Sequence, residues 1–225
     1  MYKAKIIEKK ELTHDVFELI LKKPEGFNFK AGQFITAKIE DQNPPCFRGY
    51  SIASSPKNKN IELCIKTIKG GRGSNWLNSL KKEDELSFIG PNGEFTLQNT
   101  NKDNIFVATG TGIAPFKAII EKHLENHKNK MHLIWGLRHV EDICYKELFE
   151  ELAKKHSHFT FDLTLSRPAD SWKGKSGRVT KLIQNYDIKD QEVYICGLND
   201  MITSVEEILK EKGLPENQIH FEKYD

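Results

Sequence analysis

The first half of the chain is a series of short runs in which apolar and polar residues alternate as they do in strands. The alternation is clearest in residues 16–23 (VFELILKK) and 61–68 (IELCIKTI), where apolar side chains fall on one face. The predicted strands are residues 2–10, 16–23, 33–40, 46–54, 61–68 and 85–90. Only one short helical segment, residues 75–80, stands among them. Six strands with so little helix predict a small antiparallel barrel.

The pattern changes beyond the polar stretch at residues 98–104 (QNTNKDN). Apolar strand-like runs now alternate with helical segments. The predicted strands are residues 104–110, 131–137, 159–165, 192–198 and 218–224, and the predicted helices are 115–126, 144–156, 179–186 and 201–213. Apolar runs that lead into helices are typical of a parallel, doubly wound sheet. The sequence therefore predicts a β domain at residues 1–98 and an α/β domain at residues 104–225.

The composition fits a globular protein and excludes some partners. Of 225 residues, 38% are hydrophobic and 29% are charged, which allows a buried core. Lys and Arg number 34 against 32 Asp and Glu, so the net charge of +2 gives no reason to expect nucleic acid or membrane as a partner. The N-terminus lacks a signal-peptide core, and no apolar run is long enough to span a bilayer. We expect a cytoplasmic protein.

The four cysteines are Cys46, Cys64, Cys144 and Cys196, and each is isolated in the sequence. Zinc sites and iron–sulfur clusters use closely spaced cysteine pairs, which this chain lacks. We therefore expect reduced thiols, no metal site and no cluster of the chain's own.

The first predicted strand of the second half ends in VATGTGIAPF, residues 107–116. Gly110 and Gly112 remove side chains where the strand turns into a helix, and Pro115 suits the first turn of that helix. Free amides at this turn can face a pyrophosphate. The motif departs from GxGxxG, because Pro115 stands where the third glycine would be. The alternative is an ordinary strand-to-helix turn.

A second glycine-rich stretch, GGRGSNWL, covers residues 70–77. Its three glycines bare the backbone, and Ser74 is predicted to cap a helix that begins at Asn75. Arg72 adds a nearby cation, so this stretch is also a candidate anion site. The alternative is a flexible hairpin with a capped helix behind it. One anion site in each half suits an enzyme that holds two nucleotides.

The strand-like stretch FRGYSIASSP, residues 47–56, carries Arg48, Tyr50, Ser51 and Ser54 in a tight order. Arg48 and Tyr50 are two residues apart and share one face of the predicted strand. Taken alone, the stretch is also explained as an edge strand with a solvated arginine.

These stretches belong to six motifs that together resemble the ferredoxin–NADP reductase superfamily of flavoenzymes, essentially from end to end. The motifs are Arg-x-Tyr-Ser-x-x-Ser at residues 48–54, Gly-x-x-Ser at 71–74, Gly-Pro-x-Gly-x-Phe at 90–95, Gly-Thr-Gly-x-Ala-Pro at 110–115, Ser-Arg at 166–167 and Cys-Gly-x-x-x-Met at 196–201. The resemblance implies an FAD-binding barrel followed by a Rossmann-like NAD(P)-binding domain, without a ferredoxin domain.

For the first half, the resemblance implies an FAD site along the strand that carries Arg48. Arg48 would neutralise the FAD pyrophosphate. Tyr50 would lie along the isoalloxazine and the ribityl chain, and the Ser51 hydroxyl would bond N5, the atom that receives the hydride. The implied FAD contacts are Arg48, Tyr50, Ser51, Cys64, Ile65, Lys66, Gly71, Arg72, Gly73 and Ser74.

For the second half, the resemblance implies a nicotinamide dinucleotide across the strand ends. Cys196 would lie beside the nicotinamide ring and orient the reacting carbon. The implied contacts are Thr109, Gly110, Thr111, Gly112, Ala114, Pro115, Arg138, Ser166, Arg167, Arg178, Gly197 and Met201. Arg138 would contact the ribose or adenine, while its neighbours Asp142, Tyr145 and Glu147 are interpreted as scaffold.

The choice between NADPH and NADH depends on residues after the strand at 159–165. By resemblance, Ser166, Arg167 and Arg178 would grip the 2′-phosphate of NADPH, with Lys175 as a further candidate. The pattern Trp172-x-Gly174 instead resembles NADH-using oxygenase reductases. The prediction is NADPH.

The C-terminus matches the family's Glu-x-Tyr at Glu222 and Tyr224. Tyr224 would cover the flavin face that the nicotinamide must reach, and Glu222 would relay a proton towards the flavin. Asp225 follows the tyrosine, whereas many relatives end on it. The alternative is a frayed polar tail.

The resemblance implies hydride transfer from NAD(P)H to FAD, followed by electron transfer to a separate carrier. That partner would be a ferredoxin, a flavodoxin or an oxygenase component, and a monomeric reductase is expected. Two alternatives stay open: a free-flavin reductase, for which the flavin is a substrate, and a non-catalytic electron-transfer subunit of a larger complex. The residues assigned to catalysis are Ser51, Cys196 and Glu222.

Overall fold

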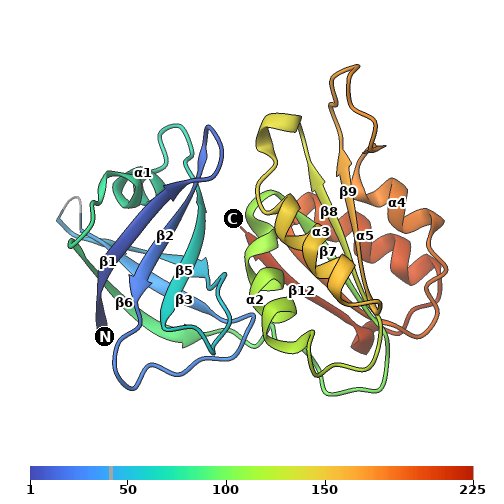
Figure 1. Ribbon diagram of the computed structural model, residues 1–225, viewed down its shortest axis with the longest axis horizontal. Coiled ribbons are helices and arrows are strands. Elements are labelled where there is room, and N and C mark those ends of the chain that lie inside the picture. Colours follow the sequence, from blue (N-terminus) through green and yellow to red (C-terminus); the bar gives the residue numbers. More distant parts are fainter. Residues whose placement is uncertain (41–42, 225) are drawn as a thin grey trace. The chain divides into compact units, whose positions relative to one another are not determined.

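The computed structural model describes residues 1–40 and 43–224 (Figure 1). The chain divides into two compact units. The β unit comprises Met1–Leu97 and Ala114–Lys122, and the α/β unit comprises Gln98–Ile113 and the described residues from His123 onward.

The β unit is built on a six-stranded antiparallel sheet with the strand order β4-β3-β6-β1-β2-β5. Its strands are β1 (Tyr2–Glu11), β2 (Val16–Lys22), β3 (Phe34–Ile39), β4 (Cys46–Ser51), β5 (Asn60–Lys66) and β6 (Glu85–Asn92). An antiparallel bridge between Ile52 and Leu63 joins the residue after β4 to β5. The bridge links the two outer strands of the sheet, so the predicted six-stranded barrel is confirmed.

The barrel core follows from the period of two in its strands. In β3, Ile35, Ala37 and Ile39 are buried, while the residues between them are only partly covered. Helix α1 (Arg72–Ser79) adds Leu77 to this core. Burying a large aliphatic side chain contributes about 1.5–3 kcal/mol to the stability of the fold. Because the alternation puts these side chains on one face of each strand, it favours a barrel that buries that face.

Helix α2 (Ile113–His123) is counted with the β unit over most of its length. The rings of Phe95 and Phe116 lie 5.7 Å apart, which packs the helix against the chain that follows β6. Gly32 has φ +100, and a Cβ there would lie 1.9 Å from the Phe95 carbonyl oxygen. Only glycine therefore fits at this position.

The α/β unit has a six-stranded sheet in the order β10-β9-β8-β7-β11-β12, and every pairing is parallel. The strands are β7 (Asn104–Thr109), β8 (Met131–Leu137), β9 (Phe159–Leu165), β10 (Lys175–Ser176), β11 (Glu192–Leu198) and β12 (Ile219–Tyr224). The predicted parallel, doubly wound sheet is confirmed. The short strand β10 was not predicted.

Helices cover both faces of this sheet (Figure 1). Helices α4 (Val179–Asn185) and α5 (Asn199–Glu211) share one apolar cluster with strand residues such as Val107 and Ile195. Helix α3 (Lys146–Lys155) lies on the opposite face, where the rings of Phe149 and Trp135 are 6.3 Å apart. Strands buried on both faces explain the continuous apolar runs in the sequence.

Two further observations bear on the predictions. Residues 219–224 form the parallel strand β12, so the alternative of a frayed polar C-terminal tail is wrong for these residues. Among the helices of the described residues, none is long and apolar enough to cross a membrane.

Candidate functional site

Strand β4 and the start of helix α1 meet at Gly73. Arg48 and Tyr50 are two residues apart on β4, so their side chains point to the same side. A Cβ built on Gly73 would lie 2.9 Å from the Tyr50 hydroxyl and 3.1 Å from Cγ of Arg48. The glycine therefore lets the first turn of α1 approach both side chains, and any larger residue would displace them.

Arg48 brings an available cation to this point. Its side chain is exposed, and its Nη1 donates to the Phe47 carbonyl at 2.8 Å. Within residues 1–40 and 43–224, no carboxylate pairs with this guanidinium. Burial raises the pKa of Tyr50 to about 12, although the charge of Arg48 acts to lower it. The site thus offers a cation beside a neutral phenol, which suits a phosphate group.

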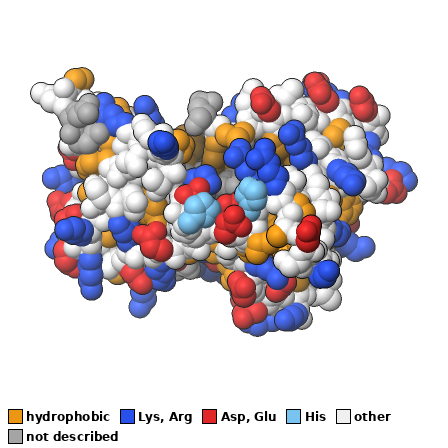
Figure 2. Space-filling model, turned by 90° about the horizontal axis from the view of Figure 1, so that it is seen from above, with side chains coloured by type: hydrophobic (Ala, Val, Ile, Leu, Met, Phe, Trp, Pro, Cys, Tyr) orange, Lys and Arg blue, Asp and Glu red, His pale blue; other side chains and the backbone are white. Residues whose placement is uncertain are grey.

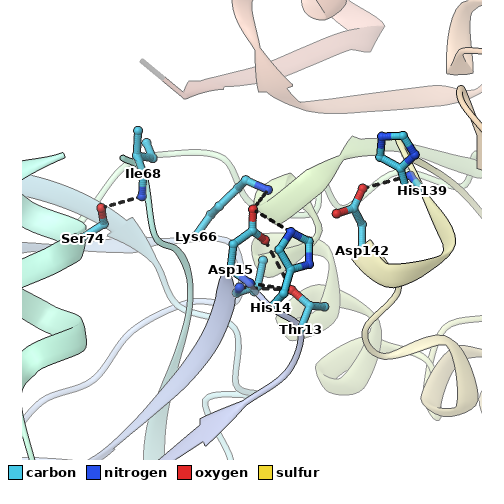
Figure 3. Close-up of polar contacts among 9 residues, drawn as sticks. Thr13, His14, Asp15, Lys66, Ile68, Ser74, His139 and Asp142 are labelled. Atoms are coloured by element: carbon cyan, nitrogen blue, oxygen red, sulfur yellow. Dashed lines mark hydrogen bonds and ion pairs between the residues drawn. The ribbon is translucent and has the colours of Figure 1, made fainter. Parts of the chain in front are cut away.

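The predicted N-cap at Ser74 is wrong. Helix α1 begins at Arg72 with Gly71 as N-cap, and no side chain caps it. The Ser74 hydroxyl instead accepts the backbone N–H of Ile68 at 3.1 Å, which closes the loop before the helix (Figure 3). Because the first amides of an α-helix have no partner within it, the turn that contains Gly73 still presents N–H donors.

Ser51 and Ser54 are both buried at the end of β4 and just beyond it. Ser51 ends β4 and is 6% exposed. The buried Ser54 hydroxyl accepts the N–H of Glu62 at 3.1 Å and donates to the Asn60 carbonyl at 3.2 Å. Ser54 therefore fixes the junction between β4 and β5.

The segment Cys64–Lys66 forms the end of β5, whose backbone pairs with β2. The side chain of Lys66 forms an ion pair with Asp15 at 2.5 Å (Figure 3). Cys64 and Ile65 are buried. The three side chains are thus already engaged in packing or pairing, and the backbone is the part of this segment that can serve a ligand.

In the α/β unit, a tight turn joins β7 to α2. It is the short 3₁₀ segment Gly110–Gly112, and Pro115 falls in the first turn of α2, as predicted. A Cβ on Gly112 would lie 2.3 Å from the Cys196 carbonyl oxygen, and one on Gly197 would lie 2.4 Å from Oγ1 of Thr109. These glycines let the turn and the ends of β7 and β11 approach closely, at the carboxyl ends of the strands, where doubly wound sheets bind their ligands.

Cys196 lies on β11 between Ala108 of β7 and Glu222 of β12, and it is fully buried. Burial raises the pKa of its thiol well above the usual range, and the charge of Glu222 raises it further, while a hydrogen bond with Tyr224 acts in the opposite direction. The thiol is therefore protonated at neutral pH. A protonated, buried thiol is neither a nucleophile nor a metal ligand.

Three arginines stand beyond the carboxyl ends of β8, β9 and β10. Arg138 follows β8, Ser166 and Arg167 follow β9, and Arg178 follows β10. Backbone bonds hold the first two segments together, since the N–H of Arg167 donates to the Arg138 carbonyl at 2.8 Å. All three arginine side chains are exposed, and in the described part of the chain none has an ion-pair partner. Figure 2 looks onto the side where β8 and β9 end and shows Lys and Arg side chains clustered there.

The residues after Arg138 form a fixed loop. The carboxylate of Asp142 accepts the N–H of His139 at 2.9 Å (Figure 3). Tyr145 adopts a left-handed conformation with φ 53 as the N-cap of α3, and Glu147 lies in the first turn of that helix. These contacts fit the scaffold role that was predicted for Asp142, Tyr145 and Glu147.

Lys175 has a partner of its own. Its Nζ lies 2.6 Å from the carboxylate of Asp162, and Tyr186 donates to the same carboxylate. The indole N–H of Trp172 donates to the Lys175 carbonyl at 2.9 Å, which orders the loop. The Asp162 partner was not visible in the sequence, because nothing in the pattern indicated that β10 would pair beside β9. Lys175 is therefore a poorer phosphate ligand than the three arginines.

The contacts of Asp162 are expected to make the stability of the fold depend on pH in the acid range. Burial acts to raise the pKa of Asp162, but hydrogen bonds from His132, Lys175 and Tyr186 outweigh it and hold the pKa well below the ordinary value. The carboxylate therefore stabilises the fold above the unfolded-state pKa, and this contribution is lost as pH falls through the folded-state value. Asp162→Asn is expected to lower the free energy of unfolding at pH 7 by about 1–3 kcal/mol. Urea titrations should show a smaller difference from wild type at pH 3, and an equal difference at both pH values would contradict the prediction.

Comparison with known proteins places these features in a family. Residues 3–97 match the oxidoreductase FAD-binding domain, and residues 106–207 match the oxidoreductase NAD-binding domain.

Full-length comparisons agree with both domain matches. The chain is 31% identical to ferredoxin–NADP reductase B of Sorangium cellulosum over 100% of this chain and 98% of that protein. It is 29% identical to the toluate 1,2-dioxygenase electron transfer component of Pseudomonas putida over 99% of this chain and 67% of that protein. A ferredoxin NADP+ reductase from Neisseria gonorrhoeae, solved with bound FAD and NADP, has the same fold, with a TM-score of 0.87, 23% identity, and coverage of 99% and 98% of the two chains.

The two domain matches identify an FAD-dependent NAD(P)H oxidoreductase, which passes electrons from NAD(P)H through FAD to an acceptor. The glycine-lined turns and the exposed guanidinium of Arg48 fit such cofactors. The chain belongs to the ferredoxin–NADP reductase superfamily.

Proposed function

We propose that this reductase uses NADPH and passes electrons from FAD to a ferredoxin or a flavodoxin in the cytoplasm. The observation that carries the proposal is the group of three exposed arginines without ion-pair partners in the described residues, at the carboxyl ends of β8, β9 and β10. The match to a ferredoxin–NADP reductase over 98% of its length supports the choice of acceptor. Four free cysteines suit a reducing compartment.

The β unit supplies the proposed FAD site, with a domain boundary at about residue 98. Bound FAD supplies the chemistry, because it accepts a hydride and releases electrons to the carrier. Arg48 neutralises the pyrophosphate, and the amides of the α1 turn at Gly73 and Ser74 donate to its oxygens. Tyr50 covers the ring and ribityl chain. Ser51 offers a hydroxyl to N5 from a buried, fixed position, which orients the ring without a change in charge.

The α/β unit, proposed to begin at residue 104, supplies the nicotinamide nucleotide site. The turn at Gly110–Gly112 offers amides to the pyrophosphate at the strand ends. Cys196 fills the space beneath the reacting ring as a neutral, rigid side chain. Glu222 and Tyr224 lie on β12 beside it, and Glu222 is the residue that would relay a proton towards the flavin.

The preference for NADPH follows from charge. A 2′-phosphate carries between one and two negative charges near pH 7, and Arg forks bind phosphate oxygens in pairs. Ser166 stands where an acidic residue would repel that phosphate and bond the ribose hydroxyl of NADH instead. The backbone N–H of Arg167 donates to the Arg138 carbonyl, so the two arginines extend from adjacent points of the backbone.

Arg167→Ala is expected to lower kcat/KM for NADPH by about tenfold or more, because it removes a charge-assisted contact worth about 1.5–3 kcal/mol. The value for NADH should change by less than about threefold, since NADH lacks the phosphate. The measurement is the ratio of kcat/KM for the two cofactors in wild type and variant. Lys173→Ala, in the same exposed loop, is the control. A wild-type preference for NADH, or a ratio of kcat/KM values that is unchanged in Arg167→Ala, would contradict the proposed preference for NADPH.

A further inference from the structure

Helix α2 carries a buried cation that none of the roles above uses. The Nζ of Lys117 lies 2.7 Å from Glu62, 2.9 Å from Glu121 and 3.3 Å from the Ala53 carbonyl oxygen. Its side chain is only 7% exposed. Burial lowers the pKa of Lys117, but Glu121 and Glu62 outweigh this and raise it above the ordinary value. The ammonium group is therefore charged, and its N–H donors face these acceptors.

The acceptors lie at the junction that closes the barrel. Ala53 is two residues after Ser51, and Glu62 is two residues before Cys64. The N–H of Ala53 donates to the Glu62 carbonyl at 2.7 Å, next to the bridge between Ile52 and Leu63. Lys117 thus holds the junction between the two segments proposed to contact the flavin ring.

The same helix continues from the proposed nucleotide-binding turn. The 3₁₀ segment Gly110–Gly112 leads directly into Ile113, the first residue of α2. Lys117 is little more than one helical turn further along, and Glu121 holds its ammonium group from the next turn of the helix. A buried cation paired with carboxylates resists displacement, since separating the charges leaves each one unpaired and desolvated.

We propose that Lys117 is a positioning residue that couples the Gly110–Gly112 turn to the flavin-contacting ends of β4 and β5. The proposal rests on the FAD and nucleotide sites proposed above. A nucleotide bound at Gly110–Gly112 would limit the motion of that segment and of the start of helix α2, which follows it. Through its contacts, Lys117 would pass this effect on to Ala53 and Glu62. Charge-assisted contacts to a buried ammonium group suit this task, because they are strong and directional.

The test compares Lys117→Met with Lys122→Met, a control on the same helix for which no ion pair occurs in the described residues. Each FAD-loaded variant is titrated with NADP+ while the flavin difference spectrum is recorded, and the limiting rate of flavin reduction by NADPH is then measured in stopped flow. Hydrogen exchange of the cofactor-free proteins reports on residues 52–54 and 110–113 without any catalysis. Glu62→Gln serves as a second variant, since it keeps an oxygen acceptor but removes the charge.

In Lys117→Met, the limiting rate is expected to fall about tenfold, and exchange should rise in both segments, while FAD and NADP+ affinities change by less than about threefold. The NADP+ difference spectrum should lose most of its amplitude. Glu62→Gln should show smaller changes in the same rate, exchange and spectrum. If Lys117→Met does not fold, the result for Glu62→Gln tests the proposal. Wild-type rate and spectrum in both variants, or a parallel loss of FAD affinity and rate, would overturn the proposal. A wild-type protein that fails to bind FAD would refute the proposed function itself.

Discussion

Replacing Arg48 by alanine is expected to weaken FAD binding by about tenfold to a hundredfold. The guanidinium is exposed on β4, has no carboxylate partner in the described residues, and stands beside the N–H donors of the α1 turn. A charge-assisted bond to a diphosphate is worth about 1.5–3 kcal/mol, which sets the expected range. The measurement is a titration of FAD into the cofactor-free variant, followed by flavin fluorescence.

Two variants make this result specific. Arg48→Lys keeps the charge but loses the planar fork, so an intermediate affinity is expected. Lys38→Ala removes a cation from the neighbouring strand β3 whose charge is already paired with Glu40, and it should bind FAD as the wild type does. If Arg48→Ala binds FAD with unchanged affinity, Arg48 does not belong to the site.

Replacing Cys196 by alanine is expected to slow flavin reduction by about tenfold or more, with the spectrum of bound FAD nearly unchanged. The thiol is buried and protonated at the end of β11, so its contribution is shape and contact, not charge. Alanine removes the sulfur and leaves the reacting ring less constrained. Stopped-flow reduction of the FAD-loaded variant by NADPH measures the effect.

The control for this variant is Cys144→Ala, which removes another buried thiol of the α/β unit, outside the proposed site. It should reduce the flavin at the wild-type rate. Cys196→Ser keeps a side chain of similar size and should recover part of the loss. A Cys196→Ala protein that is reduced as fast as the wild type would show that the thiol only packs.

Local patterns were enough to predict the architecture. The period of two in β3 and the unbroken apolar runs of β7 and β11 reflect burial on one face and on both faces, which is a property of each segment alone. The family resemblance, and not the local pattern, suggested that Gly112 and Cys196 serve one nucleotide site; in the structure a Cβ on Gly112 would lie 2.3 Å from the Cys196 carbonyl oxygen.

Local patterns could not predict contacts between residues that are far apart in the sequence. Lys117 and Glu62 are 55 residues apart, and each alone looks like an ordinary surface charge. The two-residue strand β10 is too short to show any period. Ser74 was misassigned as a cap because the pattern favours serine there, whereas the structure uses its hydroxyl to close the preceding loop and starts the helix at Arg72.

We propose that this chain carries electrons from NADPH through bound FAD to a separate carrier. The most direct test mixes the FAD-loaded protein with NADPH without oxygen, then adds oxidised flavodoxin or ferredoxin, and follows the flavin absorption band throughout. The band should bleach on addition of NADPH with about one FAD per chain and return when the carrier is added. A protein that retains no FAD, or whose bound flavin does not bleach with either NADPH or NADH, would contradict this electron path.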